Sequence, residues 1–535
     1  MGVDSGGRIR RVRRVSPMAE HMSDGAPIRR IVIVGGGTAG WMVAAALARF
    51  VGGNGRRIVL VESEAIGIVG VGEGTIPPIL EFNHQLGLDE AEYLRATNAT
   101  YKLGIEFVDW TEKGQRYFHQ FGEIGRPLNG LSFHQIWLKY RDRPSVGPLA
   151  DYSMSAVAAA KHRFAHSARD PNEPLSQLAY AFHFDAAAYG QFLRRHAEKL
   201  GAERIEGRIV DVEQDGETGY VTALKLDDDR RVRGDLFIDC SGFRSLLLGD
   251  KLGVKFEDWS HWLPCDRALA VPSERDGPLL PFTRSTAHPA GWQWRIPLQH
   301  RTGNGHVYSS AHMSDDEAGR ILFETLDSKP IAEPRLLTFK AGRRSRSWEK
   351  NVIAIGLSAG FLEPLESTSI HLIQHAIQRL LGLFPGRGIS PVERDEFNRA
   401  MVNSYEPVRD FIILHYHATR RAGAFWDHVR TMDLPDTLKH KFELFREHGR
   451  VFRYNDELFD VPSWVAVMLG QDVIPANVDP LADALPEADV LRAIAEQRSG
   501  YEQTALKLPL ASEYIERMIA AKHRSSSSLL GGREQ

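Results

Sequence analysis

A glycine-rich turn near the N-terminus places the strongest constraint on the fold of this chain. It follows the apolar run Arg30 to Val34, which has the pattern of a β-strand, and Trp41 to Phe50 after it has the composition of a helix. A second apolar run, Ile58 to Val61, ends in Glu62, about 20 residues past the turn, the spacing of a carboxylate that binds ribose hydroxyls. The turn itself is GGGTAGW, with the GxGxxG glycines Gly35, Gly37 and Gly40. This order of elements predicts a βαβ unit that binds NAD or FAD, and the alternative is a glycine turn built only for close packing.

Two later apolar runs have the same form of a strand that closes on a small-residue turn. One is GDLFIDCSG, from Gly234 to Gly242, and the other is NVIAIG, from Asn351 to Gly356. Their distance from the first turn predicts a discontinuous nucleotide-binding domain with insertions. Large FAD-dependent hydroxylases are built in this way, so FAD is the favoured dinucleotide.

The last of these runs leads directly into FLEPLESTSI, from Phe361 to Ile370. Pro364 is incompatible with a helix interior, so the segment around it is expected to be extended. Ser367 and Thr368 are good N-cap residues, and a helix is expected to begin near Ser367 because helically spaced apolar residues follow at Ile370, Ile373, Ile377, Leu380 and Phe384. The free N–H groups of such a helix start suit a small anion, and Glu366 would stand directly before it. The alternative is an ordinary loop with a capping hydroxyl and a solvated glutamate.

A strand is also predicted at YKLGIEFV, where a lysine interrupts an apolar alternation. Lys102 and Glu106 would share the face opposite to that of the apolar residues, which are Tyr101, Leu103, Ile105 and Phe107. Lysines are rarely buried, so the pattern alone predicts a solvated side chain.

Composition and charge exclude several classes of protein. The net charge of −3 over 535 residues gives no reason to expect a nucleic acid or an anionic membrane as a partner. The only cysteines are Cys240 and Cys265, so neither a disulfide framework nor a metal cluster is predicted. No apolar run is long enough to span a membrane, and a cytoplasmic enzyme is expected.

The chain is predicted to be an α/β protein with four segments. Residues 1–27 are basic (RIRRVRR) and read as a disordered leader, and residues 28–390 as a Rossmann-like, flavin-monooxygenase-type FAD module with a mixed sheet. Residues 391–524 have helical periodicity and are expected to form a mainly helical subdomain that covers the substrate side. The Ser- and Gly-rich residues 525–535 are expected to form a flexible tail.

Eight motifs occur along the chain in a fixed order: GGGTAGW, GVGEGTIP (Gly70 to Pro77), NATYKLGIEF (Asn98 to Phe107), FHQFG (Phe118 to Gly122), FHFD (Phe182 to Asp185), DLFIDCSGFR (Asp235 to Arg244), GWQWRIP (Gly291 to Pro297) and EPLEST (Glu363 to Thr368). In these motifs the chain resembles the flavin-dependent tryptophan halogenases, from Ile31 to about Trp426 and more loosely to Pro475. GWxWxIP is specific to that family. Its second mark, FxxPxxSxG, is filled except that Ser369 replaces the final glycine.

The resemblance implies a two-component enzyme that uses O2 and a halide. A separate NAD(P)H-dependent flavin reductase supplies FADH2, and hypohalous acid forms and crosses an internal passage to a lysine beside an aromatic substrate. Matched position by position, the lysine is Lys102 and the essential carboxylate is Glu366. The lysine would act by positioning the halogen, and the carboxylate by accepting the proton that the arene loses.

The resemblance also implies the ligand contacts. The halide, chloride or bromide, would bind at Thr368 and Ser369, where a serine still offers its backbone N–H and needs no positive φ at a helix start. Flavin contacts would include the turn glycines and Glu62, together with Thr38, Ala39, Ser63, Glu73, Ile209, Leu357 and Ile370. Trp292 and Trp294 alternate on one strand face and are expected to form a wall between flavin and substrate.

Substrate contacts are expected from two regions. His119 and Phe121 share a strand face at the family positions that sandwich an indole, although a lone histidine is more often a core or surface residue. In the C-terminal segment Tyr454 to Pro475 only Phe459 and Trp464 are aromatic after Tyr454, and the paired tyrosines that grip free tryptophan in the family are absent. The charged residues there are acids, chiefly Asp456, Glu457 and Asp460. We therefore expect a pocket for an indole or a larger aromatic compound.

Two other functions are compatible with parts of the sequence. A single-component FAD hydroxylase would insert oxygen with NADPH, and a non-catalytic flavin-binding protein would turn over no arene. Lys102, Glu366 and GWQWRIP argue against both.

Overall fold

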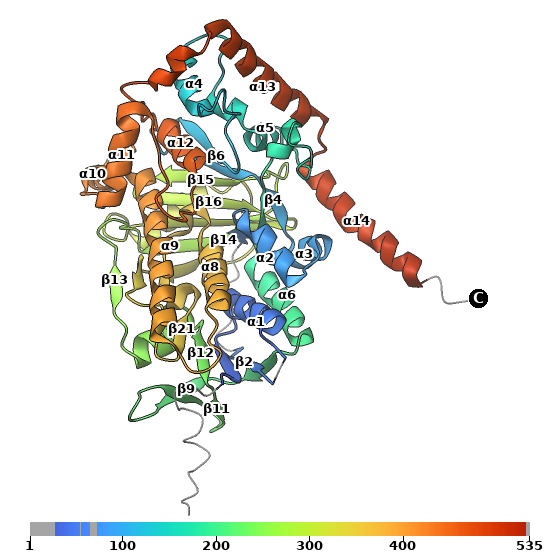
Figure 1. Ribbon diagram of the computed structural model, residues 1–535, viewed down its shortest axis with the longest axis vertical. Helices are drawn as coiled ribbons and strands as arrows, with labels where there is room; N and C mark the ends of the chain where they lie inside the picture. The colour runs from blue at the N-terminus through green and yellow to red at the C-terminus, as the bar shows by residue number, and fades with distance from the viewer. Residues whose placement is uncertain (1–26, 54, 65–71, 531–535) are drawn as a thin grey trace, which may run out of the picture.

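The computed structural model describes residues 27–53, 55–64 and 72–530, with side chains up to residue 521 (Figure 1). The leader predicted at residues 1–27 lies outside the described residues except for Pro27, as do Gly70 and Val71 of GVGEGTIP and residues 531–535. The four-segment division therefore stays a prediction.

A six-stranded sheet at one end of the molecule contains the glycine-ended strands. Its strands are parallel except for the short edge strand β20, and α1 (Thr38–Phe50) packs on it with α6 (Ala186–Lys199) against α1. The three runs that end in glycine turns lie side by side as β21, β12 and β1, although they are far apart in sequence. The order is β20 (Trp348–Glu349), β21 (Val352–Ala354), β12 (Leu236–Asp239), β1 (Arg30–Val34), β2 (Arg57–Glu62) and β8 (Glu203–Glu206).

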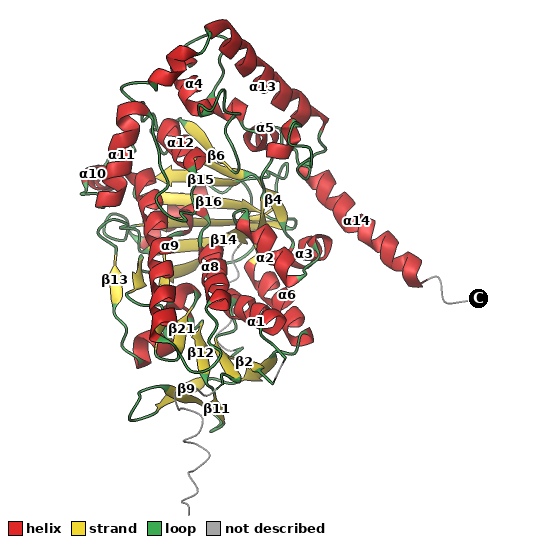
Figure 2. Ribbon diagram, viewed as in Figure 1, coloured by secondary structure: helices red, strands yellow, loops and turns green. Residues whose placement is uncertain are grey.

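A larger sheet crosses the middle of the molecule (Figure 2). Neighbouring strands are antiparallel except β15 and β5, which pair in parallel. The order is β18 (Arg335–Thr338), β14 (Arg267–Glu274), β17 (Arg301–Tyr308), β16 (Gly291–Pro297), β15 (Thr283–His288), β5 (Gly104–Val108) and β6 (Arg116–Gln120). A small antiparallel sheet contacts β16 and β17 through β3, in the order β3 (Gly72–Gly74), β7 (Ala181–Asp185) and β4 (Thr100–Lys102).

Two further three-stranded sheets and five helices complete the N-terminal two thirds. The sheets are β9 (Ile209–Gln214), β10 (Val221–Leu226) and β11 (Arg231–Arg233), and β13 (Phe256–Asp258), β19 (Gly342–Arg344) and β22 (Gly360–Phe361). The helices are α2 (Pro78–Leu86), α3 (Glu90–Thr97), α4 (Phe133–Tyr140), α5 (Met154–Ala160) and α7 (Asp315–Glu324).

The chain after residue 382 is mainly helical. The long α9 (Pro391–His417) packs against α8 (Ser369–Gly382), and α12 (Val461–Gly470) packs on β6 (Figure 1). The other helices are α10 (Ala424–Thr431), α11 (Asp436–His448), α13 (Glu487–Lys507) and α14 (Ala511–Leu530), so helix α14 includes the first residues of the segment expected as a tail. The expectation of a mixed α/β protein with a helical C-terminal region is confirmed.

The described residues contain no helix that is both long and apolar enough to cross a membrane. Both cysteines are buried and free.

Two local predictions need correction. Pro364 does not lie in extended chain but opens the 3-10 turn Pro364–Glu366, because the first turn of a helix tolerates a residue that has no N–H. Lys102 and Glu106 do not share one strand, since the strand breaks at Leu103 and its halves enter different sheets as β4 and β5.

Candidate active site

Lys102 ends β4, and its side chain is completely buried. Its Nζ donates a hydrogen bond to Ser367 Oγ at 2.8 Å and lies 5.3 Å from the centre of the Phe121 ring. Burial lowers the pKa of the ammonium to about 7, against the opposing effect of the nearby Glu366 carboxylate. Lys102 is therefore a partly ionised group in a dry site at neutral pH, and the solvated lysine expected from the strand pattern alone is wrong.

Glu366 ends the 3-10 turn and is also buried. His119 Nδ1 lies 2.9 Å from Oε2, and His415 Nε2 lies 2.7 Å from Oε1. Burial by itself raises the pKa of Glu366, but the two histidines outweigh it and hold the pKa at about 2. Because an ionised carboxylate can only accept hydrogen bonds, Nδ1 of His119 carries a hydrogen and donates it to Glu366.

His415 is a site residue that the sequence analysis did not single out. It lies on α9, its Nδ1 is 2.9 Å from the Tyr117 hydroxyl, and its ring stacks on Phe107 with centroids 4.6 Å apart. Burial lowers its pKa. In the sequence it is one of two histidines at the end of a long helix, and only the fold brings it to Glu366.

The positions expected to hold the halide lie at the start of α8. Thr368 is the N-cap and is completely buried, and its Oγ1 makes neither a capping hydrogen bond nor any other hydrogen bond to a described residue. The left-handed backbone of this segment falls on Ser367, with φ of +57°, and not on Ser369. Ser369 thus replaces the family glycine at a place where any residue fits.

Trp292 and Trp294 lie together on β16, as expected, with ring centroids 6.1 Å apart. Trp292 Nε1 donates to Glu363 Oε2 at 2.8 Å, and the Tyr416 hydroxyl donates to the same oxygen at 2.5 Å. Glu363 is completely buried, and burial raises its pKa to about 7. Trp292 thus anchors the segment before Glu366, and its expected role in a wall between flavin and substrate stays a prediction.

The residues expected to contact substrate lie around the same centre. His119 is on β6, but it binds Glu366, and Phe121 follows that strand beside Lys102. Phe459 stacks on Phe411 of α9 with centroids 3.8 Å apart, and Trp464 meets Phe411 edge-on at 4.9 Å. The His119 and Phe459 rings are 6.1 Å apart. These rings form one aromatic wall next to the glutamate.

The acids of the C-terminal segment are already paired with cations. Asp456 Oδ2 lies 3.4 Å from Arg379 Nη2 of α8, and Asp460 Oδ1 accepts a hydrogen bond from Arg453 Nη1. Glu457 Oε2 accepts from the buried Lys441 of α11 at 2.6 Å, and that ammonium lies 4.4 Å from the Trp464 ring centre. Glu457 is held in a buried ion pair, and Asp456 and Asp460 are exposed, so none of the three offers a buried, unpaired carboxylate to an ammonium group.

The GxGxxG turn has the shape that a pyrophosphate requires. Gly35 has φ of +106°, and a Cβ built there would lie 2.3 Å from the Cys240 carbonyl oxygen. A Cβ at Gly40 would lie 1.8 Å from the carbonyl oxygen of Gly35, whereas one at Gly37 would meet nothing within 4 Å. Because no side chain in the described part of the chain caps α1, the N–H groups at Thr38 and Ala39 are available to bind an anion.

Of the other expected dinucleotide contacts, Glu62 and Leu357 lie beside this turn. Glu62 ends β2 against Gly36, and Arg204 donates to its carboxylate at 2.5 Å. Ser63 follows β2. Gly207 N donates a hydrogen bond to the carbonyl oxygen of Glu62, so Ile209, two residues after Gly207, lies near the end of β2. Leu357 follows Gly356, where a Cβ would lie 2.9 Å from Ala39 Cβ. Ile370 is buried in α8, and burial raises the pKa of Glu73 to about 7.

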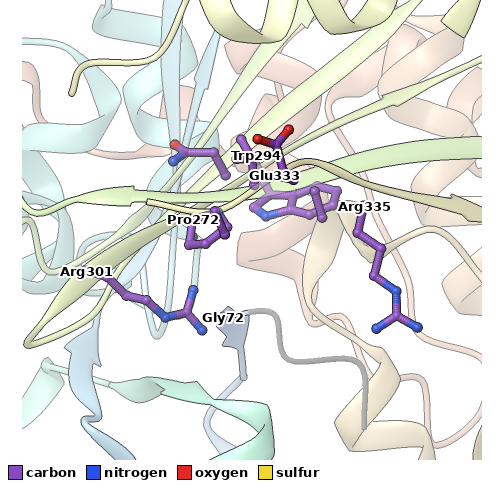
Figure 3. A pocket seen from close by; sticks show the side chains of 11 residues that line it. Gly72, Pro272, Trp294, Arg301, Glu333 and Arg335 are labelled. Atoms are coloured by element: carbon purple, nitrogen blue, oxygen red, sulfur yellow. The ribbon is translucent and has the colours of Figure 1, made fainter. Parts of the chain in front are cut away.

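A pocket of about 180 Å³ opens beside β3 (Figure 3). Gly72 and Trp294 line it, and in the close-up the Trp294 indole lies between Arg301 and Arg335. Gly72 and Gly74 share one face of β3, so the pocket and the Lys102 site are neighbours along that strand.

Comparisons with known proteins show the family of this chain. A family model described as tryptophan halogenase matches residues 30–487. The tryptophan 6-halogenase SttH of Streptomyces toxytricini is 35% identical over 519 residues, covering 91% of this chain and 98% of that protein. The flavin-dependent halogenase Xcc4156 from Xanthomonas campestris superposes with a TM-score of 0.89 at 47% identity, covering 92% of this chain and 98% of that one. BrvH from Brevundimonas sp. BAL3, also a flavin-dependent halogenase, gives 0.88 at 48% identity, covering 92% and 99%. The resemblance found in the sequence is confirmed: this chain belongs to the tryptophan halogenase family and is a flavin-dependent halogenase.

Proposed function

We propose that this enzyme halogenates an indole-type or larger aromatic substrate with hypohalous acid that Lys102 positions, and that free tryptophan is a poorer substrate. The observation that carries the proposal is the buried pair Lys102 and Glu366, with Lys102 bound to Ser367 and Glu366 bound to His119. A lysine and a carboxylate buried next to an aromatic wall suit an oxidant that must be held beside a ring.

Each member of the pair has a distinct task. The Lys102 ammonium donates to the oxygen of hypohalous acid and directs the halogen toward the arene. The halogen–oxygen bond breaks as the arene π electrons form the carbon–halogen bond, and the lysine protonates the departing hydroxide to water. Glu366, ionised because its pKa is about 2, takes the proton that the arene loses.

The family implies FAD, and the turn described above fits it. Gly35, Gly37 and Gly40 would admit the pyrophosphate to the N-terminus of α1, and Glu62, Ser63, Glu73, Ile209, Leu357 and Ile370 would surround the rest. Bound reduced FAD would supply the two-electron reduction of O2 that makes the oxidant. We propose that a separate NAD(P)H-dependent reductase delivers FADH2, and that the halide binds the backbone at Thr368 and Ser369, where the N-cap side chain leaves the first N–H groups of α8 free.

The C-terminal segment supports the substrate class. Burying an ammonium or a carboxylate without a partner costs several kcal/mol. The segment Tyr454–Pro475 contains no Lys, Arg or His, and its main acids are already paired with Arg379, Lys441 and Arg453. Indole carries neither charge and escapes this cost.

The test is a series of competing indoles that carry no charge, one charge or two charges. Indole, tryptamine, indole-3-propionate and tryptophan are offered with FAD, a flavin reductase, NADH and chloride or bromide. The expected order of kcat/KM is indole first, the singly charged compounds next and tryptophan last. A higher kcat/KM for tryptophan would show that its head group is held elsewhere in the chain and would contradict the substrate proposal.

A further inference from the structure

The small sheet β3–β7–β4 brings a buried histidine to Lys102. His183 lies at the centre of β7, opposite Gly74 of β3 on one side and Thr100 of β4 on the other. Thr100 and Lys102 are two residues apart on β4, so their side chains lie on the same face of the sheet. His183 is directly opposite Thr100 and shares that face. His183 belongs to the FHFD motif, to which the proposed function assigns no task.

His183 links two buried threonines by hydrogen bonds. Its Nδ1 is 3.0 Å from Thr100 Oγ1, and its Nε2 is 2.9 Å from Thr283 Oγ1 on β15. Thr100 Oγ1 donates to the carbonyl oxygen of Pro297 at 2.7 Å. His183 and both threonines are buried.

The direction of this chain follows from the single hydrogen of each hydroxyl. The carbonyl of Pro297 can only accept, so the Thr100 hydrogen is used there and His183 Nδ1–H must donate to Thr100 Oγ1. Burial and the nearby Lys102 hold the pKa of His183 well below its usual range, so the ring is neutral and its Nε2 accepts from the Thr283 hydroxyl. Thr283 Oγ1 then has only lone pairs left for its other neighbours.

Those lone pairs lie beside Lys102. A Cβ built at Gly74 would lie 2.8 Å from Ser367 Oγ, 3.1 Å from Lys102 Nζ and 3.4 Å from Thr283 Oγ1, so the three polar atoms surround one point on the glycine face of β3. Ser367 takes one of the three ammonium hydrogens, and the ammonium makes no other hydrogen bond to a described residue. The site thus combines free N–H donors with a fixed acceptor.

We propose that Thr283, held as an acceptor by His183, binds the O–H of the hypohalous acid whose oxygen Lys102 binds. The acid is a donor at its O–H and an acceptor at its oxygen, which matches the two sides of the site. The contacts to Lys102 and Thr283 together fix the direction of the oxygen–halogen bond, whereas a single contact would leave the hypohalous acid free to rotate. His183 is a positioning residue, because it acts through its hydrogen bond to Thr283. The inference rests on the proposed function and extends it.

The first experiment measures coupling, which is the halogenated product formed per O2 consumed, with FADH2 supplied by a reductase and a soluble enol trap for escaping hypohalous acid. Thr283→Val keeps the shape and removes the acceptor, so coupling should fall about tenfold while O2 consumption holds and trapped oxidant rises. Thr283→Ser should recover it. Ser285→Ala is the matched control, because Ser285 lies two residues along the same strand and its buried Oγ has no hydrogen-bond partner among the described residues.

Unchanged coupling in Thr283→Val would overturn the proposal, and so would a loss of O2 consumption in proportion to product, which would indicate a purely structural role. The second measurement needs no turnover: nitrogen-15 NMR of labelled histidine should show His183 as the neutral Nδ1–H tautomer, and an Nε2–H tautomer would overturn it. If the wild type makes no halide-dependent product, the proposed function fails, and the tautomer still tests the hydrogen-bond chain separately.

Discussion

The turn Pro364–Glu366 and the residue before it carry two buried glutamates that the protein surrounds in opposite ways. Glu363 accepts hydrogen bonds from neutral groups, Trp292 and Tyr416, and burial raises its pKa to about 7. Glu366 lies against His119 and His415, which overcome the effect of burial and hold its pKa at about 2. Three residues of sequence therefore separate a carboxyl whose pKa is raised to about 7 from one whose pKa is lowered to about 2.

Under the proposed function, the chemistry lies on one side of the turn. On the Glu366 side lie Lys102, Ser367 and the histidines, all buried and all able to exchange protons or hydrogen bonds. On the Glu363 side lie two aromatic donors and Cys265, whose Sγ is 3.5 Å from the Tyr416 hydroxyl. Glu363, which accepts two hydrogen bonds and is only partly ionised near pH 7, is suited to holding Trp292 in place. Glu366, which is ionised, is suited to accepting a proton.

The largest effect is expected at the lysine of the ionised side. Lys102→Ala should abolish halogenation, because the oxidant still forms but nothing holds it beside the arene. O2 consumption and escape of hypohalous acid into a trap should continue. Lys102→Met, which keeps the apolar volume of the side chain, controls for collapse of the site, and full turnover by either variant would refute the role of Lys102.

The pH dependence of coupling tests the charge of that lysine. Since the pKa of Lys102 is about 7 and the ammonium is the working form, product per O2 should fall above pH 7, by up to about tenfold per pH unit. Glu366 stays ionised over this range, because its pKa is about 2. A rise in coupling with pH would instead show that the neutral amine carries the halogen.

A smaller effect is expected on stability, with opposite signs for the two glutamates. The folded pKa of Glu363 is raised from 4.5 to about 7, so its contribution is fully present below pH 4.5 and is lost as the pH rises toward 7. In the wild type this loss lowers the free energy of unfolding by roughly 3 kcal/mol at most between those two pH values. Urea unfolding at several pH values should show that Glu363→Gln removes this decline.

Glu366→Gln is the matched control in that series. Its folded pKa is depressed, so its contribution is present above pH 4.5 and is lost only as the pH falls toward 2. Glu366→Gln should therefore leave the slope of the free energy of unfolding against pH unchanged between pH 5 and 7. The same slope in both variants would contradict the assigned ionisation states.

The sequence predicts local features of this molecule better than assembled ones. The strand, glycine turn and helix at residues 30–50 are contiguous, so hydrophobic period and glycine spacing suffice to place them. The start of α8 was expected near Ser367 and lies at Ser369, within the usual uncertainty of a helix boundary. Lys102 and Glu366 were identified by matching motifs, and the strand pattern alone gave the wrong environment for the lysine.

The contacts that tune the site were not predictable in this way. His415 reaches Glu366, and His183 reaches Thr283 across 100 residues of sequence, through pairings of sheets and helices that no local pattern specifies. The acids at Asp456, Glu457 and Asp460 were expected to be the charges available to a substrate. Their partners lie partly on α8 and α11, so their neutralisation appears only in the folded chain.

The most direct measurement is the rate of product formation by Glu366→Gln and Glu363→Gln, assayed side by side with indole and saturating FADH2. The substitutions are chemically identical and lie three residues apart in one segment. Glu366→Gln should lose roughly 10²-fold or more, the scale of a general base, and Glu363→Gln should stay within about threefold of wild type because its amide can still accept from Trp292 and Tyr416. Equal losses, or a larger loss at Glu363, would contradict the assignment of the chemistry to Glu366.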